Sequence, residues 1–126
     1  MSYPAELLYT KDHEWLRIEG NVATVGITHY AQGELGDIVY VDVEALDDNL
    51  EEGAVFGSIE AVKTVSDLFM PVAGTITELN EAINDAPDVV NSDPYGEGWI
   101  VKIEMAEGAG KDHLMDVKAY MAEIGA

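Results

Sequence analysis

The sequence predicts a mainly β protein, a compact β-sandwich or barrel with short peripheral helices and a helix near the C-terminal end. Three observations predict this class. Short runs rich in β-branched and aromatic residues recur along the chain, clusters of turn-forming residues separate them, and the last stretch carries apolar residues at helical spacing. The chain has 126 residues, 48% of them hydrophobic, so one core can be buried and a single domain over 1–126 is expected.

The first third of the chain is predicted to hold three strands and one helical turn. Extended runs over 14–18 and 22–27 flank Gly20-Asn21, a dipeptide suited to tight hairpin turns. Thr28 can cap a short helix that continues to Leu35. The run 37–43 follows, and its β-branched residues alternate with polar ones, which predicts a strand.

The middle of the chain is predicted to form a hairpin around 54–70. A polar turn over 47–53 precedes it, and the two strands are expected over 54–62 and 65–70. Pro71 forces a break after the second strand because proline cannot donate a backbone hydrogen bond.

The remaining elements are shorter, except for the last. A strand is predicted over 74–79, a short helix over 80–86, a cluster of turn formers over 91–96 and a final strand over 99–105. The segment 111–124 is predicted to be a helix that packs on the sheet, because four apolar residues fall on one helical face. They are Leu114, Val117, Met121 and Ile124.

The charge balance argues against two classes of partner. The chain has 25 Asp plus Glu against 6 Lys plus Arg, a formal net charge of -19, so duplex nucleic acid and anionic membranes should be repelled. Apolar residues spread along the whole chain argue against disorder and favour a solvated acidic surface. Composition leaves open an adaptation to high salt. An acidic surface would also steer basic partners to it.

Location and redox chemistry follow from what the sequence lacks. It has no cysteine, which excludes disulfides, thiolate nucleophiles and cysteine metal sites. Residues 1–10 have neither the basic region nor the apolar run of a signal peptide, and no stretch is apolar for long enough to span a membrane. A cytoplasmic protein is expected.

One lysine stands apart. Lys63 is the only lysine or arginine between Arg17 and Lys102, although 17 Asp or Glu residues lie from 18 to 101. It falls where two strands should reverse, yet residues 61–64 contain no Gly, Pro, Asn or Asp to favour a turn. A lysine at such a tip holds its amine away from the core on a flexible stem, as a modifying enzyme requires. An ordinary exposed lysine is the alternative.

A resemblance decides between these alternatives. The run 57–74, GSIEAVKTVSDLFMPVAG, resembles the lipoyl-attachment segment of the glycine cleavage system H protein family. Segments before and after it resemble that family in the same order, so the resemblance covers nearly the whole chain. They are His13-Glu14-Trp15, Gly26-Ile27-Thr28 with Tyr30-Ala31, 35–41, and 91–96 with Gly98-Trp99.

The resemblance implies a barrel-sandwich hybrid fold, like that of lipoyl domains, with lipoate joined by an amide bond to Lys63. It also implies that the attachment site is recognised through Glu60, Val62 and Thr64. Biotinyl carriers usually place Met on both sides of the modified lysine, so Val62 and Thr64 favour lipoate over biotin. Ala61 departs from the family, which often has Ser at this position two residues before the lysine.

The implied role is that of a carrier and not of an enzyme. The arm on Lys63 would accept an aminomethyl group from glycine at a pyridoxal-phosphate glycine decarboxylase and pass it to a tetrahydrofolate-dependent aminomethyltransferase. Dihydrolipoyl dehydrogenase would reoxidise the arm, and a lipoate ligase or lipoyl transferase would attach it. A carrier of a cationic amine needs acidic groups to hold it. Asp12, Glu14 and Asp67 are the candidates for this cleft, with ordinary surface acids as the alternative.

Three other functions are alternatives, and one of them, a purely structural role, is opposed only by the lysine motif. A free-standing enzyme is opposed by the three histidines, which form no recognised motif: His13-Glu14 lacks the second His of a zinc-protease helix, and His29 and His113 stand alone. An H-like carrier that relays lipoyl groups to other enzymes shares the same motifs, so the sequence leaves it open.

Overall fold

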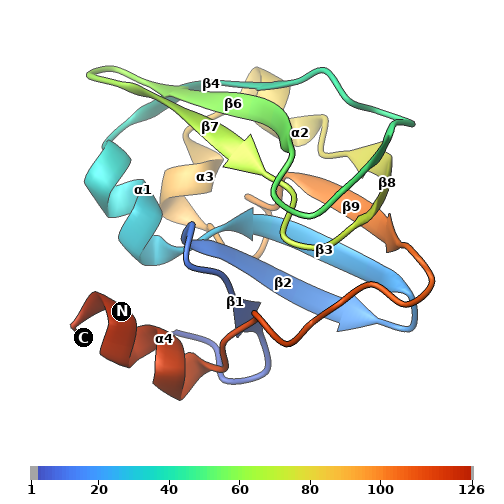
Figure 1. Cartoon of the computed structure of the whole chain (residues 1–126). Helices are drawn as coiled ribbons and strands as arrows, with labels where there is room; N and C mark the ends of the chain where they lie inside the picture. Colours follow the sequence, from blue (N-terminus) through green and yellow to red (C-terminus); the bar gives the residue numbers. More distant parts are fainter. Residues whose placement is uncertain (1–2, 126) are drawn as a thin grey trace.

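A computed structural model describes residues 3–125 as two antiparallel β-sheets packed face to face (Figure 1). The larger sheet has the strand order β1-β2-β3-β9-β8-β5, and the smaller has the order β4-β6-β7. The strands are β1 (Leu8–Tyr9), β2 (Glu14–Glu19), β3 (Val22–Ile27), β4 (Ile38–Val43), β5 (Asn49–Leu50), β6 (Val55–Ala61), β7 (Val65–Phe69), β8 (Gly74–Leu79) and β9 (Val101–Met105).

Four short helices lie around the sheets. They are α1 (His29–Leu35), α2 (Ala82–Asp85), α3 (Val89–Ser92) and α4 (Val117–Ile124). Figure 1 shows α1 and α3 at one end of the two layers and α4 outside the larger sheet, beside β1.

The core lies between the two sheets. Strands β2, β3 and β9 contribute Leu16, Val25 and Ile103, and β4, β6 and β7 contribute Val41, Ile59 and Leu68, all of which are buried. Each strand turns alternate side chains inward, so the outer face of β4, β6 and β7 is left to polar and charged residues and a few exposed apolar ones. The hairpin that carries Lys63 therefore belongs to a sheet whose inner face packs against the core.

Several predicted elements are confirmed. The opening hairpin joins β2 to β3 through Gly20, which has a φ of 62°. Thr28 caps α1, since its Oγ1 accepts a hydrogen bond from the backbone N–H of Ala31 at 3.2 Å. Strand β8 has the bounds that the sequence predicts.

Two predicted turns need correction, and one strand is missing from the prediction. The polar turn expected over 47–53 contains β5, which pairs with β8, and β1 was not predicted at all. Both strands have two residues, and they exist because a longer neighbour pairs with them. The turn cluster expected over 91–96 begins inside α3.

Two of the three predicted helices are shorter than expected. The helix predicted over 80–86 is α2, only four residues long. The C-terminal helix predicted over 111–124 begins at Val117, because the Asp116 carboxylate caps it by accepting the N–H of Ala119 at 2.8 Å. Just before it, Met115 pairs with Tyr9 as a β-bridge. The side chain that α4 buries fully is Tyr120, which lies on the same helical face as the predicted Val117 and Ile124 but was not among the four apolar residues named.

Within residues 3–125 no helix combines the length and the apolar composition that crossing a membrane requires. The same residues bring together no cluster of three or more His, Asp or Glu side chains suited to a metal ion.

Candidate functional site

Lys63 lies at the tip of the hairpin formed by β6 and β7. The Ala61 N–H donates to the Thr64 carbonyl at 2.8 Å and closes the turn, and Lys63 itself is exposed. Figure 1 shows this tip reaching beyond the body of the smaller sheet, above α1. The amine is therefore accessible to another protein.

The turn at this tip needs no glycine. None of residues 61–64 has a positive φ, which explains why the usual turn formers are absent there. The Val62 N–H instead donates to the Asp37 carbonyl at 3.1 Å, which ties the tip to the entry of β4. The tip is thus supported by the segment that joins α1 to β4.

Gly36 occupies that joining segment and contacts the lysine stem. Its backbone has φ 83° and ψ -156°, a region that is almost restricted to glycine. A Cβ at this position would lie 3.4 Å from Cε of Lys63. The lysine side chain therefore rests against the end of α1 before its amine reaches solvent.

Glu60, Val62 and Thr64 surround the lysine on the surface. All three are exposed, and Val62 keeps 75% of its surface accessible. Glu60 is paired with Tyr40 of β4 on one side and with Val65 of β7 on the other, so these three side chains share the outer face. The structure places the predicted recognition residues in one accessible patch.

The structure brings Asp12, Glu14 and Asp67 to one cavity, which we name the α1 cavity. Its volume is about 260 Å³. It lies between the segment 12–14, helix α1 and strands β6 and β7, and its walls are Asp12, His13, Glu14, Ile27, Tyr30, Ala31, Glu34, Leu35, Ile59, Ser66, Asp67 and Leu68. Five of these side chains are aliphatic and four are acidic. An elongated apolar group with a cationic end would match that lining.

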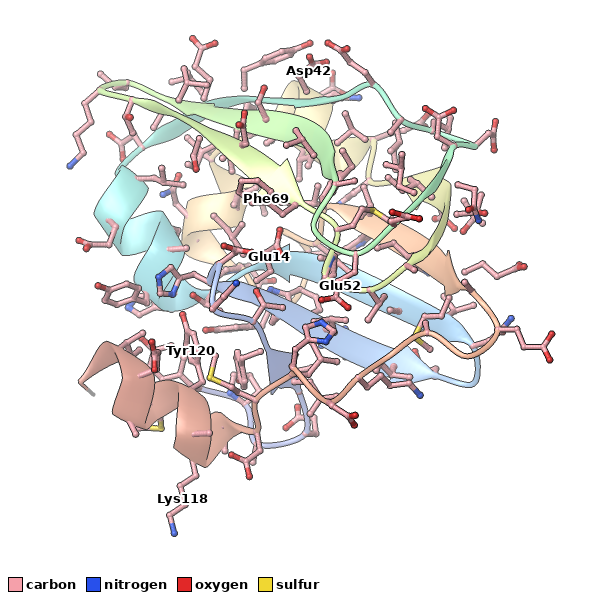
Figure 2. All side chains as sticks on the ribbon, viewed as in Figure 1. Glu14, Asp42, Glu52, Phe69, Lys118 and Tyr120 are labelled. Atoms are coloured by element: carbon pink, nitrogen blue, oxygen red, sulfur yellow. The ribbon has the colours of Figure 1, made fainter. Side chains whose placement is uncertain are left out.

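Glu14 is the buried member of the acidic set. Its side chain is 2% exposed, whereas Asp12 and Asp67 are exposed. Its Oε2 accepts the backbone N–H of Phe69 at 3.1 Å, and its Oε1 accepts the Thr10 hydroxyl at 3.5 Å. Figure 2 shows Glu14 between the two layers, below Phe69. Glu14 is therefore not an ordinary surface acid.

Burial raises the pKa of Glu14 to about 8, and the charge of Asp12 adds to this, while the hydrogen bonds from Phe69 and Thr10 oppose it. The Glu14 carboxyl is therefore mostly protonated at neutral pH. The folded protein binds this proton between about pH 4.5 and 8, where the unfolded chain does not. The free energy of unfolding consequently falls as the pH rises through that window.

Glu14→Gln should remove this loss of stability. The variant is expected to be more stable than the wild type at pH 9, by an amount on the order of 5 kcal/mol, and equally stable at pH 4. Denaturant unfolding at both pH values measures the difference. Asp67→Asn is the matched control, because it neutralises an exposed carboxylate of the same cavity and should change little. Equal pH dependence in Glu14→Gln and the wild type would contradict the assignment.

Sequence reasoning missed His13 as part of the cavity. This residue has a φ of 65°, and its Nδ1 lies 2.9 Å from the hydroxyl of Tyr120 on α4. Its ring lies against Tyr30, with 4.8 Å between the ring centroids. The contact joins positions 107 residues apart, so no local pattern could have predicted it. Figure 2 shows Tyr120 on the inner side of α4.

A second hollow, of about 440 Å³, borders the α1 cavity at Asp67. It lies over the Val55–Ser58 part of β6, at the end away from Lys63, and Asp42, Glu44 and Asp48 line it as well. Its position makes it the poorer match for a group that is attached at the hairpin tip.

These features define a class of protein. A small two-layer β domain that presents one exposed lysine on a hairpin, beside a narrow cavity with an acidic lining, is a carrier domain for a covalently attached cofactor.

Comparisons with known proteins identify the family. The family described as "Glycine cleavage H-protein" matches residues 7–125. The glycine cleavage system H proteins of Bacteroides thetaiotaomicron and Bacteroides fragilis are 52% and 53% identical, over 98% and 100% of both chains respectively. A crystal structure of a glycine cleavage system H protein from Mycobacterium marinum superposes with a TM-score of 0.89 at 35% identity, covering 98% of this chain and 100% of that one.

The chain belongs to the glycine cleavage system H protein family. It is the lipoyl carrier of that system and a non-catalytic component of it. The likeness to the solved H protein confirms the predicted barrel-sandwich fold. Membership of the system implies that glycine decarboxylase and aminomethyltransferase are among its partners.

Proposed function

We propose that Lys63 carries the lipoyl group and that the α1 cavity shelters the aminomethyl cargo between visits to the partner enzymes. The observation that carries the proposal is the placement of an exposed lysine at a hairpin tip, where the adjoining part of β6 and β7 forms one wall of that cavity. The whole chain, 1–126, acts in this proposal as one carrier domain.

The residues present fit a lipoyl group. Its hydrocarbon part would lie along the aliphatic side chains of the cavity, of which Ile27, Ile59 and Leu68 belong to the buried core. When attached, the group supplies two sulfur atoms that alternate between a disulfide and two thiols and can bond a one-carbon cargo. The chain's own part is to present the lysine, exclude water and neutralise the charge of the cargo.

The acidic lining suits the charge of an amine. Asp12, Glu34 and Asp67 are exposed at the cavity, and Glu14 lies buried in it. A hydrogen bond between an amine and a carboxylate contributes about 1.5–3 kcal/mol, and more where water is excluded. Glu14 and Asp67, with Asp12 beside them, therefore serve as the groups that hold the cargo.

Two further partners, a modifying enzyme and an oxidising one, and a location belong to this proposal. Lipoate ligase or lipoyl transferase modifies Lys63 and recognises the exposed patch of Glu60, Val62 and Thr64. Dihydrolipoyl dehydrogenase reoxidises the two thiols. These reactions occur in the cytoplasm, and the lack of cysteine means that no thiol of this chain competes with the arm by disulfide exchange.

Reconstitution with purified partners tests the proposed function. The protein bearing lipoate on Lys63 should support glycine–bicarbonate exchange by glycine decarboxylase, and the same protein without lipoate should not. Mass spectrometry of the intact protein and of its peptides reports the modification and its position. A protein modified at Lys63 that supports no exchange would instead point to a relay of lipoyl groups to other enzymes.

A further inference from the structure

Helix α1 forms one wall of the α1 cavity but is a weak helix by itself. It has seven residues, none fully buried, with Gly33 in its interior, no acidic residue in its first turn and no basic residue in its last. A helix of this length is marginal in water without outside contacts. It nevertheless supplies Tyr30, Ala31, Glu34 and Leu35 to the cavity. Contacts from elsewhere must therefore fix its position.

The segment 91–95 holds α1 at both ends. At the N-terminal end, the Tyr95 hydroxyl accepts the backbone N–H of His29 at 2.8 Å. At the C-terminal end, Nδ2 of Asn91 donates to the Gly36 carbonyl at 2.8 Å and to Oε1 of Gln32 at 2.9 Å. Free N–H and C=O groups at helix ends need such partners.

Asn91 also supports the lysine hairpin through one intervening segment. Its Oδ1 accepts the N–H of Ile38 at 2.8 Å, so a single side chain binds both Gly36 and Ile38. Between them, the Asp37 carbonyl accepts the N–H of Val62 at the hairpin tip. The joining segment 36–38 is thus fixed by Asn91 on one side and bonded to the hairpin on the other.

The segment 91–95 is itself anchored to the larger sheet. Nε1 of Trp15 donates to the Pro94 carbonyl at 2.9 Å, and Nη2 of Arg17 donates to the Tyr95 carbonyl at 3.0 Å. Next to Asn91, Val90 is fully buried in the core. Asn91 therefore joins α1 and the segment 36–38 to a segment that is itself hydrogen-bonded to the larger sheet.

We propose that Asn91 is a positioning residue of this carrier: it sets α1 against the Lys63 hairpin and so keeps the α1 cavity closed enough to exclude water. Tyr95 does the same at the other end of α1. Asparagine suits the task because its side chain offers two N–H donors and one acceptor, and all three bonds are made. This inference rests on the proposed sheltering of the cargo.

The test compares two isosteric substitutions. Asn91→Asp keeps the size and the acceptor for Ile38 but loses both donors. Asn49→Asp is the matched control, since it makes the same change at an exposed asparagine whose Nδ2 donates only to Thr75, away from α1. Tyr95→Phe removes the acceptor of the His29 N–H, and it gives a second variant should Asn91→Asp fail to fold.

Two measurements are made on each variant. Amide hydrogen exchange of residues 29–38 in the unmodified protein should be roughly tenfold faster in Asn91→Asp and unchanged in Asn49→Asp. In the isolated loaded protein, water adds to the cargo carbon, the carbon–sulfur and carbon–nitrogen bonds break, and thiol, formaldehyde and ammonium form. That loss should also be roughly tenfold faster in Asn91→Asp, as it should be in Glu14→Gln, the positive control.

The other outcomes overturn the inference in distinguishable ways. Faster exchange over 29–38 with unchanged cargo loss would mean that Asn91 holds the helix but does not position the shelter. Unchanged exchange would remove the physical basis of the proposal. A third comparison uses a short lipoyl-lysine peptide that carries the same cargo. If the wild-type protein loses its cargo as fast as this peptide does, the cavity gives no shelter, and this inference is overturned together with the proposed function. That result would come from the peptide comparison and not from the Asn91→Asp variant.

Discussion

Lys63→Arg is expected to abolish lipoylation completely, and with it all carrier activity. Arginine keeps the positive charge and much of the length of the side chain, but a ligase needs a lysine amine that can lose its proton and form an amide bond. Since Lys63 is exposed at the hairpin tip, the substitution should leave the fold and the melting temperature unchanged. The expected loss of lipoylation therefore comes from replacing the lysine amine and not from a change in the fold.

Lys118→Arg is the matched control for this experiment. Lys118 is also exposed, and Figure 2 shows it pointing away from the protein on α4, at the opposite side from the hairpin. Each variant is incubated with lipoate ligase and its substrates, and the intact mass is then measured. We expect one lipoyl increment in Lys118→Arg and none in Lys63→Arg. An increment that persists in Lys63→Arg would mean that another lysine carries the group.

Gly57→Ala should destabilise the protein by about 3 kcal/mol and lower its Tm by roughly 10 °C. A Cβ at Gly57 would overlap the carbonyl oxygen of Asp42 and crowd Val43 on the neighbouring strand. These are backbone atoms of β4, whose pairing with β6 runs through the same residues, so they can move only if the pairing is disturbed. Gly57 therefore determines how closely β4 approaches the lysine-bearing hairpin.

Gly33→Ala makes the same chemical change where space is open. Gly33 lies inside α1, and a Cβ there would meet nothing within 4 Å. Because alanine favours the helix, this control should stabilise the protein by up to about 1 kcal/mol. Thermal and denaturant unfolding measure both variants. A Gly57→Ala protein as stable as the wild type would show that β4 and β6 can separate at little cost.

Elements with their own local signal could be predicted from the sequence, and elements made by pairing could not. Strand β8 and the cap at Thr28 depend on neighbouring residues and were predicted correctly. Strand β1 is held in part by Met115, which exchanges two backbone hydrogen bonds with Tyr9 across more than 100 positions of chain. No window of sequence contains that information.

In the candidate site, too, features with a local sequence signal could be predicted, and features that depend on distant residues could not. The motif around Lys63 could be read directly, and Asp12, Glu14 and Asp67 do line one cavity. The burial of Glu14 could not be predicted, because its partner Phe69 is 55 residues away. Asn91 looked like a turn former, and only the fold reveals that its side chain joins a helix to a hairpin.

Because Glu14 is buried, the affinity of the proposed shelter for its cargo should depend on pH. The empty cavity holds a neutral carboxyl at pH 7, and an arriving cation favours its ionised form, so each cargo that enters expels about one proton. Below pH 8 the affinity of the cavity for the cargo should therefore increase by up to about tenfold for each unit by which the pH rises. A partner enzyme that returned a proton to Glu14 would loosen the cargo at the moment of transfer without moving the backbone.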